Sequence, residues 1–194
     1  MNSIQAMEKE IEFQKTYLTN ISLPKSMKPE DCFFVGNGDS FVAGLISYYA
    51  SNSIAQCCTP YDIISIPKIV HTDHVFLISL SGNVRSSVYA ARILKEKSIE
   101  TTAITANRKS QLAKICDNIL ELEYPSIGIS TAGTIGFTTT TLTCLALIGH
   151  YLDKDISKIY DKAMKISKKF NSIVFKDRFY IFLAENMLYP VCIY

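Results

Sequence analysis

The chain has 194 residues, of which 48% are hydrophobic and 20% charged. This length predicts about one domain, and the composition excludes a disordered chain because the apolar content is sufficient for a buried core. With 20 Lys and Arg against 18 Asp and Glu, the net charge of +2 gives no overall attraction to nucleic acid or to an anionic membrane, so an anion would have to be bound locally.

Residues 1–20 are polar and charged where a signal peptide needs an apolar core, and no segment reaches the ~18 apolar residues of a membrane span. We therefore expect a cytoplasmic protein. The cysteines form no CxxC pair and no zinc-site spacing, which favours reduced residues of the core. They are Cys32, Cys57, Cys58, Cys116, Cys144 and Cys192.

The N-terminal segment, residues 1–24, is predicted to form an amphipathic helix. Ile4, Met7, Ile11 and Leu18 recur at helical spacing, and Pro24 ends the pattern. An apolar stretch at 31–35 then stops at glycines and is followed by the apolar sequence FVAGLISYYA. This order predicts a buried strand, a tight turn and a buried helix.

The same order of strand, turn and helix returns further along the chain. Strands are predicted at 74–79, 99–105 and 118–122, and helices at about 84–94, 110–116 and 134–151. Strands that alternate with helices indicate an α/β fold, a three-layer αβα sandwich with a mostly parallel sheet and helices on both faces. In such sheets ligands bind beyond the carboxyl ends of the strands.

The composition changes after residue 152. Residues 153–176 predict an amphipathic helix whose lysines are more simply explained as a solvated face than as a nucleic-acid surface. Its apolar stripe, together with the apolar end of the chain, predicts a homodimer. The stripe consists of Ile156, Ile159, Ala163, Ile166 and Phe170. Residues 177–194 contain a predicted strand at 178–183 that would open an incomplete second domain.

Three turns at predicted strand ends are rich in glycine and hydroxyl side chains: 36–40, 79–83 and 126–131. Small side chains let the backbone approach an anion, and the helix start that follows favours a phosphate. A phosphorylated small molecule is the ligand that this pattern favours. The alternative, that serine and glycine simply fill tight turns, stays open.

Other candidate sites are weaker. His71 and His74 lack a further ligand apart from Asp73, so we interpret them as surface residues and expect no metal. Glu121 and Glu123 flank a strand end and are interpreted as an exposed pair. No Walker loop is present, and GNGDS lacks the third glycine of the dinucleotide fingerprint, so no cofactor is expected.

Five segments carry a likeness to a known family: MEKEIEFQ (7–14), GNGDS (36–40), ISLSGNVRSS (78–87), ITANRKSQLAKICDNILEL (104–122), and PSIGIS with GFTTTTLTCLAL (125–130 and 136–147). In this order and at these spacings they resemble the SIS (sugar isomerase) domain family, and within it the isomerase half of the glucosamine-6-phosphate synthases. The resemblance implies an SIS domain at residues 25–152. It also implies that residues 177–194 open a second SIS domain.

The resemblance further implies a phosphosugar ligand, a hexose or hexosamine 6-phosphate. Ser40, Ser79, Ser81 and Gly82 would hold its phosphate, and Ile129 and Ser130 would border the sugar. Gly38, Asp39 and Leu80 belong to the same turns. At Leu80, Asn83 and Val84 the sequence departs from the family pattern, which has Gln, Glu and Thr there.

By the same resemblance, the catalytic acid and base of isomerisation would lie beyond residue 194, and no glutaminase nucleophile is present. Two hypotheses remain. The chain is either part of a sugar-phosphate isomerase or deaminase, or a non-catalytic module that senses a phosphosugar. Asp39 is the one acidic residue in the phosphate turns, and it is expected to cap the following helix rather than to act as a base.

Overall fold

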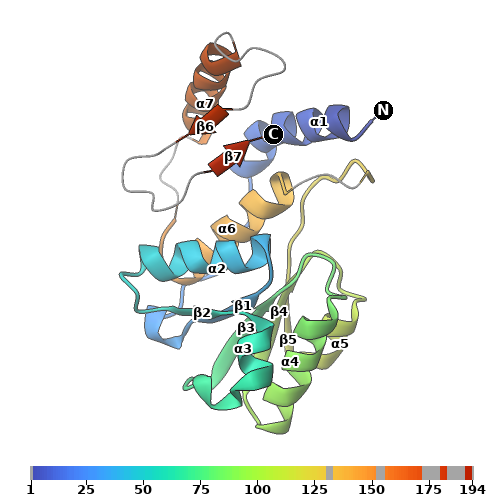
Figure 1. The fold of residues 1–194 in the computed structure, drawn as a ribbon, viewed down its shortest axis with the longest axis vertical. Coiled ribbons are helices and arrows are strands. Elements are labelled where there is room, and N and C mark those ends of the chain that lie inside the picture. The colour runs from blue at the N-terminus through green and yellow to red at the C-terminus, as the bar shows by residue number, and fades with distance from the viewer. Residues whose placement is uncertain (1, 130–132, 152–155, 172–179, 183–190, 194) are drawn as a thin grey trace. The chain divides into compact units, whose positions relative to one another are not determined.

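The computed structural model describes residues 2–129, 133–151, 156–171, 180–182 and 191–193 (Figure 1). By its contacts the chain divides into two units, Met1–Lys154 and Asp155–Tyr194. None of the helices in these ranges combines the length and the apolar character that crossing a bilayer requires.

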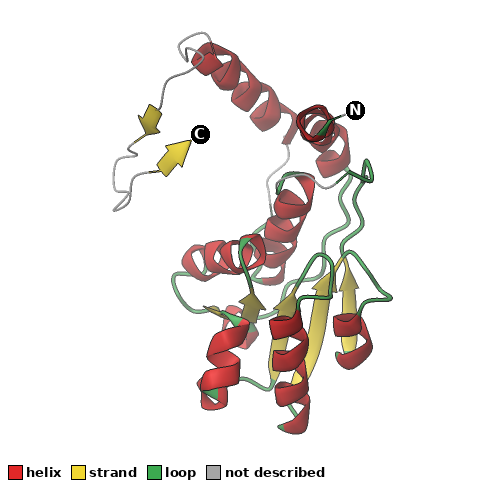
Figure 2. Cartoon of the chain, turned by 45° about the vertical axis from the view of Figure 1, so that its right-hand side comes forward, coloured by secondary structure: helices red, strands yellow, loops and turns green. Residues whose placement is uncertain are grey.

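The first unit contains a parallel sheet in the order β2-β1-β3-β4-β5. The α/β class and the parallel sheet that the sequence predicts are confirmed. Because the strands are parallel, their carboxyl ends all lie at the same end of the sheet (Figure 2). The strands are β1 (Phe33–Gly36), β2 (Gln56–Cys58), β3 (His74–Ile78), β4 (Glu100–Thr105) and β5 (Asn118–Glu121).

Helices cover both faces of this sheet (Figure 2). One face packs against α2 (Asp39–Ala50) and α6 (Ile135–Leu147), and the other against α3 (Pro60–Ser65), α4 (Arg85–Glu96) and α5 (Gln111–Ile115). Successive residues of a strand point to opposite faces, and both faces of β1 are fully buried. Short 3-10 turns lie at Pro29–Asp31 and Pro67–Ile69.

The sequence analysis predicts neither β2 nor α3. β2 has three residues at the edge of the sheet, and Gln56 is exposed, so it lacks the apolar run of a buried strand. α3 spans six residues and begins with a capping box, in which Thr59 and Asp62 bond to each other's backbone N–H. Both elements are too short to give a clear periodicity.

Helix α1 (Ser3–Thr19) forms where the sequence predicts it, with Asn2 as its N-cap. Its buried face differs from the predicted one, because Ala6, Glu10 and Leu18 are buried whereas Ile4 is 62% exposed. α1 packs against α6, and part of that contact is polar: the Thr138 hydroxyl donates to Gln14 Oε1 at 3.1 Å. An apolar stripe alone does not identify such a face.

The second unit contains α7 (Ile156–Asn171) and an antiparallel pair of strands, β6 (Tyr180–Phe182) and β7 (Val191–Ile193). The helix and the strand predicted near 178–183 are therefore present. Residues 172–179 and 183–190 lie outside the described part of the chain. The opening of a second SIS domain at 177–194 thus stays a prediction.

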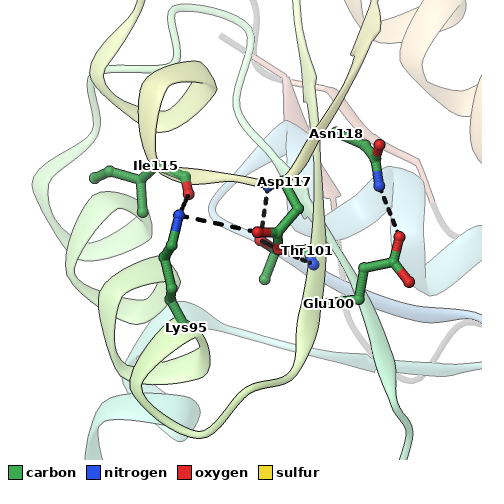
Figure 3. Close-up of polar contacts among 6 residues, drawn as sticks. All are labelled: Lys95, Glu100, Thr101, Ile115, Asp117 and Asn118. Atoms are coloured by element: carbon green, nitrogen blue, oxygen red, sulfur yellow. Dashed lines mark hydrogen bonds and ion pairs between the residues drawn. The ribbon is translucent and has the colours of Figure 1, made fainter.

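At the amino ends of the strands, Asp117 joins β4 to the start of β5 (Figure 3). Its carboxylate accepts hydrogen bonds from the Thr101 backbone N–H and hydroxyl, both at 2.9 Å, and lies 3.9 Å from Lys95 Nζ. These hydrogen bonds lower the pKa of Asp117 below its ordinary value of 3.8. The carboxylate therefore fixes the register of the last strand pair.

The lowered pKa predicts a dependence of stability on pH. Asp117 contributes stability above its unfolded pKa of 3.8, and this contribution is lost as the pH falls through the lower native value. We expect Asp117→Asn to lower the free energy of unfolding at pH 7 and to match the wild type at low pH. Urea denaturation at both pH values measures this. Asp73→Asn is the control, and an equal loss at both pH values would contradict the prediction.

Candidate functional site

The candidate site lies where the order of strands reverses. After β1 the chain adds β2 on one side of it and β3 on the other, and Gly36 of β1 pairs with Ile78 of β3. The turns that follow these two strands, 36–40 and 79–83, are therefore neighbours at the carboxyl ends of the strands. In parallel α/β sheets a ligand crevice forms at such a switch point.

The turn after β1 is shaped by two glycines. A Cβ on Gly36 would lie 2.6 Å from the backbone carbon of Ser40, so only glycine lets the chain fold back this closely. Gly38 has φ of +51° and is the N-cap of α2. Asn37 between them donates through Nδ2 to the hydroxyls of Ser86 and Ser87, at 3.0 and 3.4 Å. Asn37 thus ties this turn to the start of α4.

The turn after β3 is bent around Ser110. Gly82 has φ of +63°, and a Cβ there would lie 2.1 Å from Ser110 Oγ. The buried Ser79 hydroxyl accepts from the Gly82 N–H at 3.2 Å, and the exposed Ser81 hydroxyl accepts from the Asn83 N–H at 3.3 Å. Neither serine hydroxyl donates a hydrogen bond within the part of the chain that the structure describes, so both can donate to a ligand.

The helix starts differ in how they are capped. Side chains of Asn2, Thr59 and Ser110 cap α1, α3 and α5, whereas no side chain caps α2, α4 or α6. The first turn of α2 contains Asp39, but that of α4 contains no acidic residue. Uncapped N–H groups and the helix dipole attract an anion, and a nearby carboxylate opposes it. The start of α4 is thus the better anion site.

The start of α6 contacts both turns. A Cβ on Gly133 would lie 2.0 Å from Asp39 Oδ2, so the Asp39 side chain lies against Gly133 and does not cap α2. The Thr134 hydroxyl donates to Glu10, which is 5% exposed. Leu80 packs on Gly136 from the other turn. Asp39 is therefore not the cap that the sequence predicts, because Gly38 takes that position.

Six predicted residues lie in the two adjoining turns: Gly38, Asp39, Ser40, Ser79, Ser81 and Gly82. Leu80 lies between Ser79 and Ser81, and its side chain packs against the core cluster on the α2 and α6 face of the sheet. Ile129 is half-buried in the loop before α6, and Ser130 lies outside the described residues. Sequence reasoning missed Asn37 and Glu10, and also Tyr124, whose hydroxyl would lie 3.2 Å from a Cβ on Gly136 at the start of α6. Nothing in the sequence predicts that Glu10 is buried. Four of the five residues at 8–12 in α1 are glutamate or lysine, a pattern typical of a solvent-exposed segment.

The remaining candidates have structural roles. His74 Nε2 lies 2.8 Å from the Thr102 hydroxyl, and the ring packs on Phe76. Glu121 pairs with Arg108 at 3.1 Å. Within the described residues no group of three or more His, Cys, Asp or Glu side chains is arranged to hold a metal ion.

The cysteines are unsuited to nucleophilic chemistry. Burial raises the pKa of Cys32, Cys57 and Cys58 to about 12 and that of Cys116 to about 11. It also raises the pKa of the buried Cys144. These five thiols are not in disulfides. Since the thiolate is the reactive form, they act as core residues, as the sequence predicts.

A cavity of about 390 Å³ lies between the end of α1, the carboxyl end of β5 and α6. Tyr17, Pro24, Glu123 and Thr139 are among its lining residues, and none of the lining residues belongs to either turn. The Tyr17 hydroxyl donates to the Glu123 carbonyl across it. The cavity is thus separate from the switch point.

Comparison with known proteins places these features in a family. The family model of the SIS domain matches residues 27–149. No curated protein matches the chain.

Solved structures with the same fold have low sequence identity. Glucosamine-6-phosphate deaminase from Thermotoga maritima matches with a TM-score of 0.65 and 22% identity, over 89% of this chain and 57% of its own. Tagatose-6-phosphate ketose/aldose isomerase from Escherichia coli matches at 0.56 and 17%, over 88% and 51%. The sugar isomerase domain of an RpiR transcription factor from Sphaerobacter thermophilus matches at 0.52 and 17%, over 87% and 97%. The chain spans little more than half of the two enzymes.

The contact between Gly82 and Ser110 predicts a severe effect of a methyl group in the turn after β3. Gly82→Ala should cost about 1 to 3 kcal/mol of stability from backbone strain, and roughly 1 to 3 kcal/mol more from the clash. Gly128→Ala is the matched control, because Gly128 has φ of +75° with no atom within 4 Å of its Cβ position. Urea denaturation gives the free energy of unfolding of both variants. Equal losses in the two would contradict a clash between the added methyl group and Ser110.

Proposed function

Because the chain belongs to the SIS domain family, we propose that it binds a phosphorylated sugar at the carboxyl ends of β1 and β3. One observation carries the proposal: α4, a twelve-residue helix with neither a side-chain cap nor an acid in its first turn, follows directly on the serine turn at 79–83. Its N–H groups and dipole suit a phosphate at that point.

Side chains around the start of α4 add donors for the same phosphate. Ser79 and Ser81 come from the turn itself, and Ser40 comes from the adjoining turn that Asn37 ties to α4, where Gly38 adds its backbone N–H. Arg85, the first residue of α4, is exposed and makes no hydrogen bond or ion pair within the described ranges. A cation at a helix start is unfavourable for the helix itself, which supports an anionic ligand there.

The ligand we propose is a hexose or hexosamine 6-phosphate. The solved structures named above include proteins for glucosamine 6-phosphate and tagatose 6-phosphate, and these names support this class of ligand. Leu80 and Val84 offer no hydrogen bond where the family has polar side chains. The sugar of this chain is therefore expected to be held in part by other residues.

The reaction is proposed to be of the isomerase or deaminase type. The alternative is a module that senses a phosphosugar, which the sugar isomerase domain of the RpiR transcription factor favours. Our proposal also includes a cytoplasmic location and a homodimer. The exposure of Ile159 and Ile166 on α7, 57% and 48%, supports self-association.

Removal of the two serine hydroxyls should weaken phosphosugar binding. We expect Ser79→Ala/Ser81→Ala to reduce the affinity for fructose 6-phosphate and glucosamine 6-phosphate by about 3 kcal/mol, because hydrogen bonds to charged groups contribute about 1.5 to 3 kcal/mol each. Calorimetric titration measures this, with a melting curve to verify folding. Ser65→Ala on α3 is the control. Unchanged affinity in the double variant would refute the site.

Proton exchange separates catalysis from binding alone. The acidic groups that the structure places at the turns are Asp39 and, behind Thr134, Glu10. A positioned acid or base contributes about 10² to 10⁴-fold, and Asp39 would be repelled by a phosphate. We therefore expect this chain to bind fructose 6-phosphate in deuterated water with little exchange at C1 or C2, as followed by NMR. Exchange that Asp39→Asn abolishes would instead identify Asp39 as a base.

A further inference from the structure

The first turn of α6 brings Tyr124 close to the proposed phosphate turn. A Cβ on Gly136 would lie 3.1 Å from Leu80 Cδ1 and 3.2 Å from the Tyr124 hydroxyl. These two atoms are therefore about 6 Å apart at most. Leu80 lies between Ser79 and Ser81, so Tyr124, which follows β5, lies near the side chain of one residue of the serine turn.

The Tyr124 hydroxyl has no hydrogen bond within the described residues, although the side chain is half-buried and packs in the apolar cluster beneath α6. The hydroxyl oxygen is not among the buried polar atoms that lack a partner, so it reaches the surface. By contrast, the Tyr17 hydroxyl donates to the Glu123 carbonyl. The Tyr124 hydroxyl is therefore available to hydrogen-bond to a ligand atom.

The charges around the start of α6 select the kind of ligand atom. Glu10 is 5% exposed and bonds to the Thr134 hydroxyl, and Asp39 lies against Gly133. Two carboxylates beside this helix start oppose a phosphate. Burial, with a contribution from Glu10, raises the pKa of Tyr124, so the phenol keeps its proton and acts as a donor. A neutral sugar oxygen is the acceptor that fits.

We propose that Tyr124 determines specificity for the sugar: its hydroxyl donates to a hydroxyl or carbonyl oxygen of a ligand whose phosphate is held at the start of α4. Glu10 and Thr134 act as positioning residues, because their contact holds the first turn of α6 against which Tyr124 packs. This inference rests on the proposed function. It adds the residue that distinguishes a phosphosugar from a bare phosphate.

The test compares fructose 6-phosphate with inorganic phosphate by calorimetry. We expect the wild type to prefer the sugar phosphate, and Tyr124→Phe to weaken fructose 6-phosphate roughly 3- to 10-fold, the loss of one neutral hydrogen bond, without changing the affinity for inorganic phosphate. Tyr61→Phe, on the exposed side of α3, should change neither. Equal weakening of both probes, or of neither, would overturn the role of Tyr124.

Variants of Glu10 give a second measurement that does not depend on Tyr124→Phe. Glu10→Gln retains an oxygen that accepts from Thr134, so it should keep the wild-type ratio of the two dissociation constants. Glu10→Ala should lower the preference for the sugar. If both variants keep the ratio, Glu10 has no positioning role. If the wild type binds neither probe, the proposed function fails together with this inference, whereas phosphate binding without a sugar preference defeats this inference alone.

Discussion

The candidate site depends on one constraint of connectivity, the addition of β2 and β3 on opposite sides of β1. This order makes the ends of β1 and β3 adjacent while their following helices, α2 and α4, pack on opposite faces of the sheet. The two turns therefore open toward each other. Asn37 bonds to Ser86 and Ser87, so the first of these turns is tied to the start of α4, which follows the second, before any ligand binds.

The polar residues of α6 show how a threonine-rich helix can be buried. Thr140 and Thr141 donate to carbonyls four residues earlier in the helix, at 2.7 and 2.9 Å. These hydroxyls are satisfied within the helix, which lowers the cost of burying them, whereas the buried Thr139 hydroxyl of the same helix has no hydrogen-bond partner within the described residues. Its start is then free to contact Asp39, Leu80 and Glu10 from three other elements.

Much of this architecture follows from sequence, because long apolar strands and glycine turns leave a local pattern. β1, β3 and β4, the capping role of Ser110, and the two serine turns are of this kind. Glu10 and Tyr124 are not, since the roles proposed for them depend on contacts with the start of α6, which lies more than a hundred residues from Glu10 in the chain. Ile4 illustrates the reverse error: it belongs to an apolar stripe but is exposed, whereas Glu10 of the same helix is buried.

Different constraints are expected to act on the glycines and on the serines of the two turns during evolution. Gly36 is required by the Ser40 backbone and Gly82 by Ser110, whether or not a ligand is bound. The Ser81 hydroxyl accepts a single hydrogen bond, from the Asn83 N–H at 3.3 Å, and the Ser40 hydroxyl makes none within the described residues. A descendant that had lost its ligand would accordingly keep both glycines while its serines drifted. Glycine positions in an alignment would report shared ancestry, and serine positions would report retained binding.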